Sequence, residues 1–169
     1  IPAPNTPERP VIKSFNFPNA SNSGSVTVVA PSTHYDGSAL SGKMTLKSLL
    51  DGTLHSSTEV NAGEEVEIPF SNVSDGTHTF SFSVIVDETS SSATIYNTTF
   101  IGKDTPKTPA NVVIDSKGIK WDAVTEGINA GYIETSEITY NVYLNGTKLN
   151  EAPVTATEYA YELPYGKIK

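Results

Sequence analysis

Alternation of apolar and polar residues is the main pattern along the first hundred residues. The clearest case is the run 78–86, in which one face would carry His78, Phe80, Phe82, Val84 and Val86. The residues between them are Thr and Ser for most of the run. A period of two residues predicts a β-strand with one buried and one solvent-facing side.

Shorter runs of the same kind predict six further strands in this part of the chain. One begins at Val11, and the others cover residues 25–30, 44–50, 53–59, 65–70 and 93–101. Turn signals separate them, including Pro31, Asp51-Gly52 and Asn61-Ala62-Gly63. Seven short strands in about 100 residues, with turns at regular intervals, are typical of a β-sandwich.

The remaining residues repeat this pattern less strongly. Strands are expected at 112–115, 119–121, 139–144, 147–150 and 158–163. The segment 102–108 is rich in turn-forming residues and is the candidate boundary. We therefore expect one domain over 1–103, with a proline-rich lead-in at 1–10, and a second, partial domain over 104–169.

Three sequence echoes indicate an internal repeat. The pattern Thr-Pro-x-x-Pro stands at 6–10 and again as Thr-Pro-x-Thr-Pro at 105–109. Residues 44–53 resemble 138–147, and 73–76 resemble 163–166 more weakly. The period is about 100 residues, with small deletions in the second copy. The counterpart of 78–86 would begin where the sequence ends. We expect the natural protein to continue, or a strand-donating partner to complete the second copy.

Composition narrows the possible partners. The chain has 11 Lys and Arg against 19 Asp and Glu, a net charge of −8. Nucleic acids and anionic membranes need clustered basic residues, so neither is an expected partner. No apolar stretch reaches the length of a membrane span, so we expect no insertion into a bilayer. The chain begins without Met and without a signal peptide, which leads us to expect a mature or trimmed product.

Candidate catalytic chemistry is sparse. There is no Cys, which excludes disulfides, thiolate zinc sites and cysteine nucleophiles. His34, His55 and His78 fall on separate expected elements, and no Gly-x-Ser-x-Gly nucleophile motif is present. The alternative to having no metal site at all is a weak calcium site in the loop of Asp36 or of Asp87, which stays open. We expect no enzyme activity, and no catalytic, cofactor-binding or metal-binding residues.

Several segments resemble the fibronectin type III family. Residues 108–112 resemble its proline-led first strand, and 119–123 its second strand, with Trp121 as the core tryptophan. Residues 140–143 resemble the third strand, and 163–166 the turn before the sixth. In the first copy, Val28 or Val29 stands in place of the tryptophan, and 76–80 lacks the family's corner tyrosine.

This resemblance implies an all-β fold of two immunoglobulin-like sandwiches in tandem, the second lacking its last strands. It also implies a non-catalytic spacer or interaction module in a secreted or surface-anchored bacterial protein, without a cofactor. The alternative is an adhesion module that binds a glycan or a protein through end loops or exposed tyrosines. The candidate tyrosines are Tyr132, Tyr143, Tyr159, Tyr161 and Tyr165.

Overall fold

The computed structural model describes residues 1–162, and its regular elements are antiparallel strands apart from one 3₁₀ turn. The chain divides into two compact units, Ile1–Gly102 and Lys103–Lys169. The boundary expected from the sequence lies one residue further along. Within the described part of the chain, no helix is long and apolar enough to cross a membrane.

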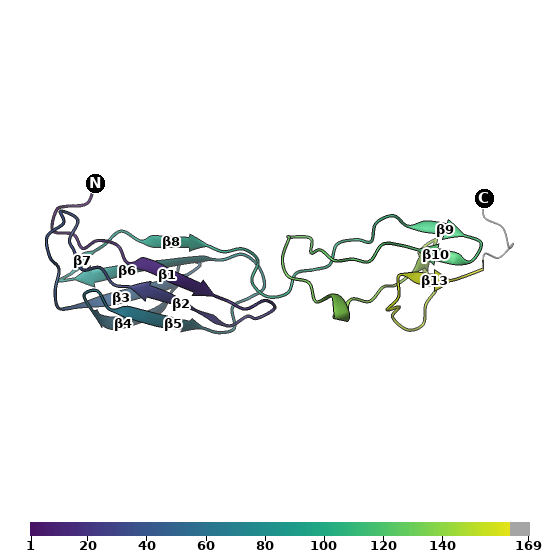
Figure 1. Cartoon of the computed structure of the whole chain (residues 1–169), viewed down its shortest axis with the longest axis horizontal. Coiled ribbons are helices and arrows are strands. Elements are labelled where there is room, and N and C mark those ends of the chain that lie inside the picture. The colour runs from purple at the N-terminus through teal and green to yellow at the C-terminus, as the bar shows by residue number, and fades with distance from the viewer. Residues whose placement is uncertain (163–169) are drawn as a thin grey trace. The chain divides into compact units, whose positions relative to one another are not determined.

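The first unit contains eight strands, which Figure 1 labels along the chain. Their bounds are β1 (Val11–Asn16), β2 (Gly24–Val29), β3 (Lys43–Leu50), β4 (Thr53–Asn61), β5 (Glu65–Phe70), β6 (Thr79–Val86), β7 (Thr89–Ser90) and β8 (Thr94–Asn97). Seven of them lie where the alternation predicted a strand. The two-residue β7 was not predicted, and β8 is shorter than the expected 93–101.

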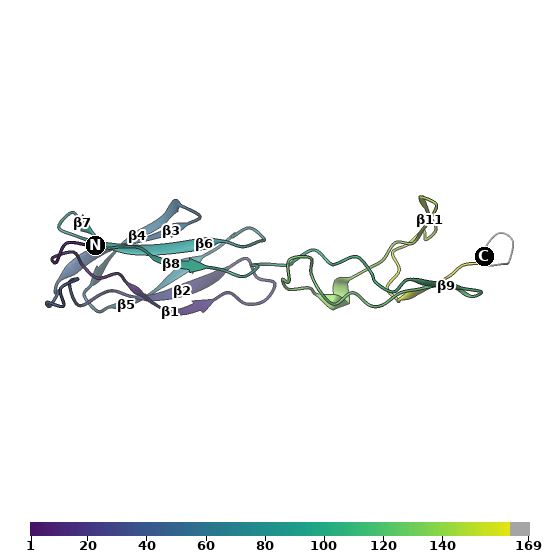
Figure 2. The ribbon, with the colours of Figure 1, turned by 90° about the horizontal axis from the view of Figure 1, so that it is seen from above.

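These strands form two antiparallel sheets that pack as a sandwich. One sheet has the order β1-β2-β5, and the other has the order β4-β3-β6-β7, with β8 also paired to β6. Figure 2 shows the two sheets of this unit edge-on as separate layers. The all-β fold class is therefore as expected.

The core lies between these two sheets. The inward face of β6 supplies Phe80, Phe82 and Val84, each fully buried, while the residues between them reach the opposite face. Phe80 packs perpendicular to Phe70 with the ring centroids 4.7 Å apart. Edge-to-face packing of this kind adds to the free energy that burial of the rings already contributes.

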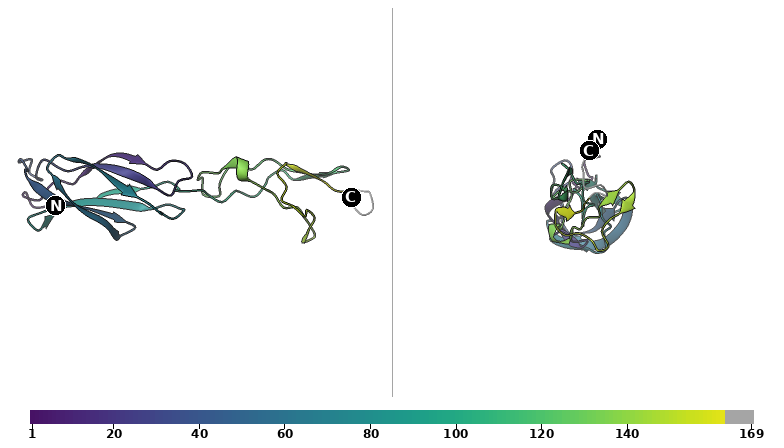
Figure 3. Two further views of the ribbon diagram at one scale, coloured as in Figure 1. Left: turned by 90° about the horizontal axis from the view of Figure 1, so that it is seen from below. Right: turned by 90° about the vertical axis from the view of Figure 1, so that its right-hand side faces the viewer.

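The second unit is built from shorter strands. Their bounds are β9 (Val113–Asp115), β10 (Gly118–Lys120), β11 (Tyr143–Leu144), β12 (Thr147–Lys148) and β13 (Glu158–Ala160), with a 3₁₀ turn at Thr135–Glu137. One sheet has the order β13-β10-β9, and β11 and β12 form a separate hairpin. Figure 3 shows that hairpin standing apart from the sheet.

The expected strand at 139–144 is regular only at its end. Tyr140 makes an isolated bridge to Val154, and the N–H of Val142 donates to the side chain of Asn150 at 2.7 Å. A side-chain oxygen thus takes the place of a backbone carbonyl, which shortens the ladder. The expected strand 158–163 ends at Ala160 as described, and residue 163 lies outside the described residues.

The two units share strand order and turn conformation. The order β13-β10-β9 matches β5-β2-β1, and the β11–β12 hairpin matches β3–β4. The turn residues Asp51 and Gly52 have φ of 51° and 82°, and Asn145 and Gly146 have 51° and 81°. Two successive positive φ values are typical of the hairpin turn that suits the twist of antiparallel strands.

The two Thr-Pro segments also make matching backbone hydrogen bonds. Each pairs twice with a later loop of its own unit. The pairs are Thr6 with Tyr35 and Glu8 with Thr33 in the first unit, and Thr105 with Ile128 and Lys107 with Glu126 in the second. The first two sequence echoes therefore coincide with repeated backbone structure, whereas residues 163–166 of the third lie outside the described residues.

Candidate functional site

The second unit has an open groove lined mainly by apolar side chains. It has a volume of about 330 Å³ and lies between β9, β10 and the segment that leads into β11. We call it the apolar groove. Its apolar side chains include Val112, Ile114, Ile119, Trp121, Val142 and Leu144.

Alternation over residues 112–114, which lead into β9, presents two apolar side chains to the groove. Val112 and Ile114 line it and are 58% and 48% exposed, whereas Val113 between them is not among the lining residues. Val113 is equally exposed, at 55%. Large apolar side chains are normally buried in such a sandwich, so these residues lack the cover that the fold would ordinarily give them.

Trp121 forms the base of the groove and has an unsatisfied polar atom. The residue is buried, and its ring centroid lies 5.2 Å from that of Tyr140. The hydroxyl of Tyr140 accepts a hydrogen bond from the N–H of Val124 at 3.0 Å. The indole Nε1 of Trp121 has no hydrogen-bond partner among the described residues. A buried donor without an acceptor costs free energy, so Trp121 has an unmet donor within the part of the chain that the structure describes.

The candidate tyrosines do not gather on one exposed face. Tyr132, Tyr159 and Tyr161 are half-buried, and only Tyr143 is largely exposed. The hydroxyl of Tyr132 donates to Glu134 at 2.8 Å, which raises the pKa of that hydroxyl. The hydroxyl of Tyr159 donates to the carbonyl of Leu149. Tyr165 lies outside the described residues.

Asp104 organises a loop near the start of the second unit. Its buried carboxylate accepts backbone N–H bonds from Thr105, Asn129 and Gly131 and a further bond from the Asn129 side chain. Burial alone would raise the pKa of Asp104, but these four donors outweigh it and hold the pKa below its ordinary value. Sequence reasoning did not single out this residue, and a Cβ on Gly127 would overlap it.

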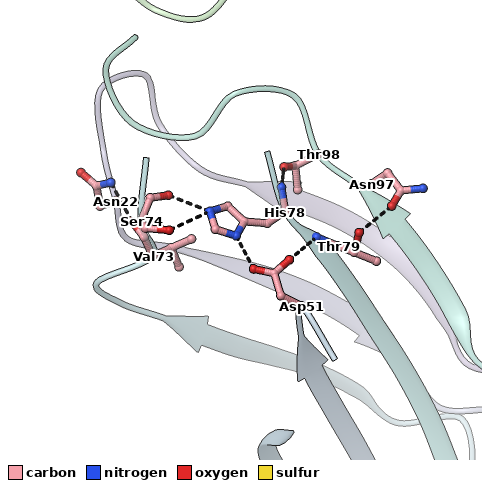
Figure 4. A network of polar contacts seen from close by, with 8 residues as sticks. All are labelled: Asn22, Asp51, Val73, Ser74, His78, Thr79, Asn97 and Thr98. Atoms are coloured by element: carbon pink, nitrogen blue, oxygen red, sulfur yellow. Dashed lines mark hydrogen bonds and ion pairs between the residues drawn. The ribbon is translucent and has the colours of Figure 1, made fainter. Parts of the chain in front are cut away.

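His78 is the centre of the polar network drawn in Figure 4. Its side chain is 8% exposed, with Nδ1 2.5 Å from Asp51 Oδ2 and Nε2 2.7 Å from the carbonyl oxygen of Ser74. Asp51 also accepts the N–H of Thr79 at 2.8 Å. The network therefore ties the β3–β4 turn to the start of β6.

Both ring nitrogens of His78 face acceptors, so the doubly protonated ring satisfies both contacts. Burial lowers the pKa of His78, but the bonds to Asp51 and Ser74 outweigh it, and the pKa lies above its ordinary value of 6.5. The N–H of Thr79 and the His78 ring together lower the pKa of Asp51 below 3.8. The two shifts widen the pH range in which the pair is ionised, and between the ordinary pKa values of 3.8 and 6.5 it is an ion pair.

The first unit should therefore lose stability as the pH rises through the folded-state pKa of His78. Because that pKa is raised on folding, its contribution is complete below pH 6.5 and is lost above the raised value. Asp51 contributes oppositely, since its stabilisation is lost as the pH falls through its lowered pKa. Urea midpoints measured across pH test this, and His78→Gln should flatten the alkaline slope. An unchanged slope in His78→Gln contradicts the assignment.

The other candidate ligands stay apart. His34 contacts Ser38, and the ring of His55 stacks on Phe70 with centroids 4.0 Å apart. The carboxylate of Asp36 accepts bonds from the N–H and hydroxyl of Ser38. Over residues 1–162, no group of three or more His, Asp or Glu side chains is arranged to hold a metal ion.

Comparison with known proteins gives no relative from which a function can be carried over. No family model matches the chain. No curated protein matches it in sequence. The functional proposal below accordingly depends on the geometry of the two units.

Proposed function

We propose that this chain is a non-catalytic spacer and interaction segment of a secreted or surface-anchored bacterial protein. Its two units are copies of one immunoglobulin-like sandwich of the fibronectin type III kind, and it positions neighbouring domains. The sheets β1-β2-β5 and β4-β3-β6-β7, the latter with β8 also on β6, support this assignment, because they form the two antiparallel layers of the sandwich that the resemblance implies. The matching order in the second unit supports the tandem.

The observation that carries the spacer proposal is the short link between the units. Ile101 exchanges both backbone hydrogen bonds with Gly76 of the first unit, and Asp104 donates its N–H to Tyr132 of the second. Only Gly102 and Lys103 lie between these anchors. A link of two residues keeps Ile101 and Asp104 within about 11 Å of each other, which limits how far the joined ends of the two units can move apart.

Gly102 is itself constrained. It has a φ of 81°, and a Cβ at this position would overlap the carboxylate of Asp75 and lie 2.8 Å from the side-chain nitrogen of Asn22. That nitrogen donates to Asp75 and to the carbonyl of Val73. The link therefore starts from a backbone position held by a polar cluster.

A distance measurement between the units tests the spacer proposal. The chain has no Cys, so Thr53→Cys and Ser116→Cys, both at exposed positions, accept one spin label in each unit. We expect one narrow distance distribution. Inserting about six Gly and Ser residues between Gly102 and Lys103, with a span of about 13 Å, should broaden it markedly. A native distribution as broad as that of the insertion variant would overturn the spacer proposal.

The adhesion alternative is favoured only in its protein-binding form. Sugar binding through stacked tyrosines needs exposed rings on a common face, and Tyr132, Tyr159 and Tyr161 are half-buried. The apolar groove instead offers aliphatic side chains beside β11, which pairs only with β12 among residues 1–162. Such a surface suits a polypeptide.

A further inference from the structure

We propose that the outer edge of β4 in the first unit pairs antiparallel with β4 of a second copy of this chain, centred on Thr58. The two β4-β3-β6-β7 sheets then continue into each other across a two-fold axis. This inference goes beyond the proposed function, because it adds an interaction surface and its partner to the spacer role. Its evidence lies wholly in the first unit.

β4 is the longest strand of the first unit and has a free backbone edge. Its pairing with β3 is regular from Ser56 to Asn61. Within residues 1–162, β4 has no strand partner on its other side, and the backbone of residues 56–60 makes no hydrogen bond outside the ladder with β3. Unpaired N–H and C=O groups along a strand are a template on which another strand can pair.

The other sheet edges of the first unit have features that hinder such pairing. β1 has a register irregularity at Lys13, and β5 contains Pro69. β7 and β8 have only two and four residues. Short strands, bulges, proline and charged side chains are the usual means by which an edge avoids another chain. β4 contains no Pro, and Glu59 is its only Asp, Glu, Lys or Arg.

The sequence of β4 selects the register of the pairing. Residues directly opposite each other in a sheet lie on the same face, so the two-fold axis passes beside a residue. A centre at Glu59 would place two carboxylates opposite each other, which is destabilising. A centre at Ser57 would place Glu59 opposite His55, where the pairing with β3 is irregular. A centre at Thr58 instead places Thr58 opposite Thr58 and Glu59 opposite Ser57.

The same register pairs an open charge on β3. Lys47 lies directly opposite Ser57 in the β3–β4 ladder. Glu59 of the second copy lies opposite Ser57 on its other side, so its Cα is two strands, or about 10 Å, from that of Lys47. Both side chains are long enough to meet above the small Ser57.

The charges on this face argue for a second copy as the partner. Lys47 forms no ion pair with any of the described residues. The Glu59 side chain lies 3.3 Å from Lys43 of its own chain and is still 67% exposed, so it is accessible to Lys47 of the other copy. Because the axis is two-fold, the pair of Lys47 with Glu59 forms twice. The edge is therefore complementary in charge to itself.

Sedimentation of the 169-residue chain over a range of concentrations tests the inference, and we expect a reversible equilibrium of monomer and dimer. Thr58→Lys, at an exposed position, places two like charges opposite each other at the axis and should weaken the dimer about tenfold or more. Thr53→Lys is the matched control. It places the same charge at an exposed position of β4 outside residues 56–60 and should change the dissociation constant less than about twofold.

Two results of the sedimentation experiment would contradict the inference. A chain that stays monomeric up to about 1 mM overturns the proposed pairing as a whole. A dimer that Thr58→Lys and Thr53→Lys weaken equally overturns the assignment to the edge of β4. Neither result concerns the distance between the two units, so the spacer proposal is tested separately.

Mixing two charge variants tests the register. Lys47→Glu places carboxylates together across the axis, and Glu59→Lys places ammonium groups together, so each variant alone should dimerise about tenfold more weakly. In a mixture of the two variants, both pairs across the axis again join Glu with Lys, and the heterodimer should regain most of the original affinity. A mixture that associates as weakly as each variant alone overturns the register centred on Thr58.

Discussion

Replacing Phe82 with alanine should lower the free energy of unfolding of the first unit by about 3–5 kcal/mol. Phe82 is fully buried on the inward face of β6. Its backbone lies opposite Ser48 of β3 on one side and Thr94 of β8 on the other. Because both neighbouring strands are fixed by ladder hydrogen bonds, the sheet has little freedom to collapse into the cavity, and most of the cost should remain.

Ile95→Ala is the matched control for this variant. Ile95 lies on β8 in the same sheet but is 61% exposed, so its truncation should change the free energy of unfolding by no more than about 0.5 kcal/mol. Calorimetry measures the loss, and fluorescence of Trp121 reports the second unit separately, since the only Trp lies there. A loss below about 1 kcal/mol for Phe82→Ala would mean that β6 does not close the core as described.

The sequence was sufficient to predict β6, because the alternation of apolar and polar residues is local to this segment and regular. Three large apolar residues alternate with Thr and Ser, and a period of two has only one structural reading over such a length. The two-residue β7 has no such signal. It exists because Asp87 and Glu88 both adopt positive φ and return the chain along β6. A pattern of apolar residues does not encode that turn.

In the second unit, a two-residue alternation alone was not enough to predict the strands. The alternation at 139–144 predicted a full strand, but the Asn150 side chain bonds the N–H of Val142 in place of a backbone partner. Asp104 escaped prediction for a similar reason. Its partners Asn129 and Gly131 lie more than twenty residues away, and only the folded loop brings their N–H groups to the carboxylate.

The network at His78 was predictable only in part. The alternation placed His78 on one face with Phe80 and Phe82, which favoured a packed or edge histidine over a ligand, and its side chain is 8% exposed. Its partner Asp51 comes from the Asp-Gly turn, whose position as a turn was also predicted. That the two meet depends on the register between β3 and β6, because Leu50 lies opposite Phe80. Register between distant strands is a tertiary property.

Gly118→Ala should destabilise the second unit by about 3 kcal/mol or more. Gly118 has a φ of 145°, a conformation that L side chains rarely adopt. A Cβ there would overlap the carbonyl oxygen of Tyr159 and lie 2.9 Å from the backbone nitrogen of Tyr161. Both are backbone atoms, one in β13, which pairs with β10, and one in the residue directly after β13, so neither can rotate away as a side-chain atom could. The backbone strain and the steric overlap therefore both lower the free energy of unfolding of this variant.

Gly146→Ala separates these two costs. Gly146 also has a positive φ, of 81°, but a Cβ there would meet no atom within 4 Å. This variant carries the backbone strain alone and should lower the free energy of unfolding by about 1 kcal/mol. Urea unfolding followed by the emission of Trp121 measures both variants in the same unit. If Gly118→Ala costs no more than Gly146→Ala, then β10 and β13 do not approach as closely as the structure has them, and the sheet beneath the apolar groove must be arranged differently.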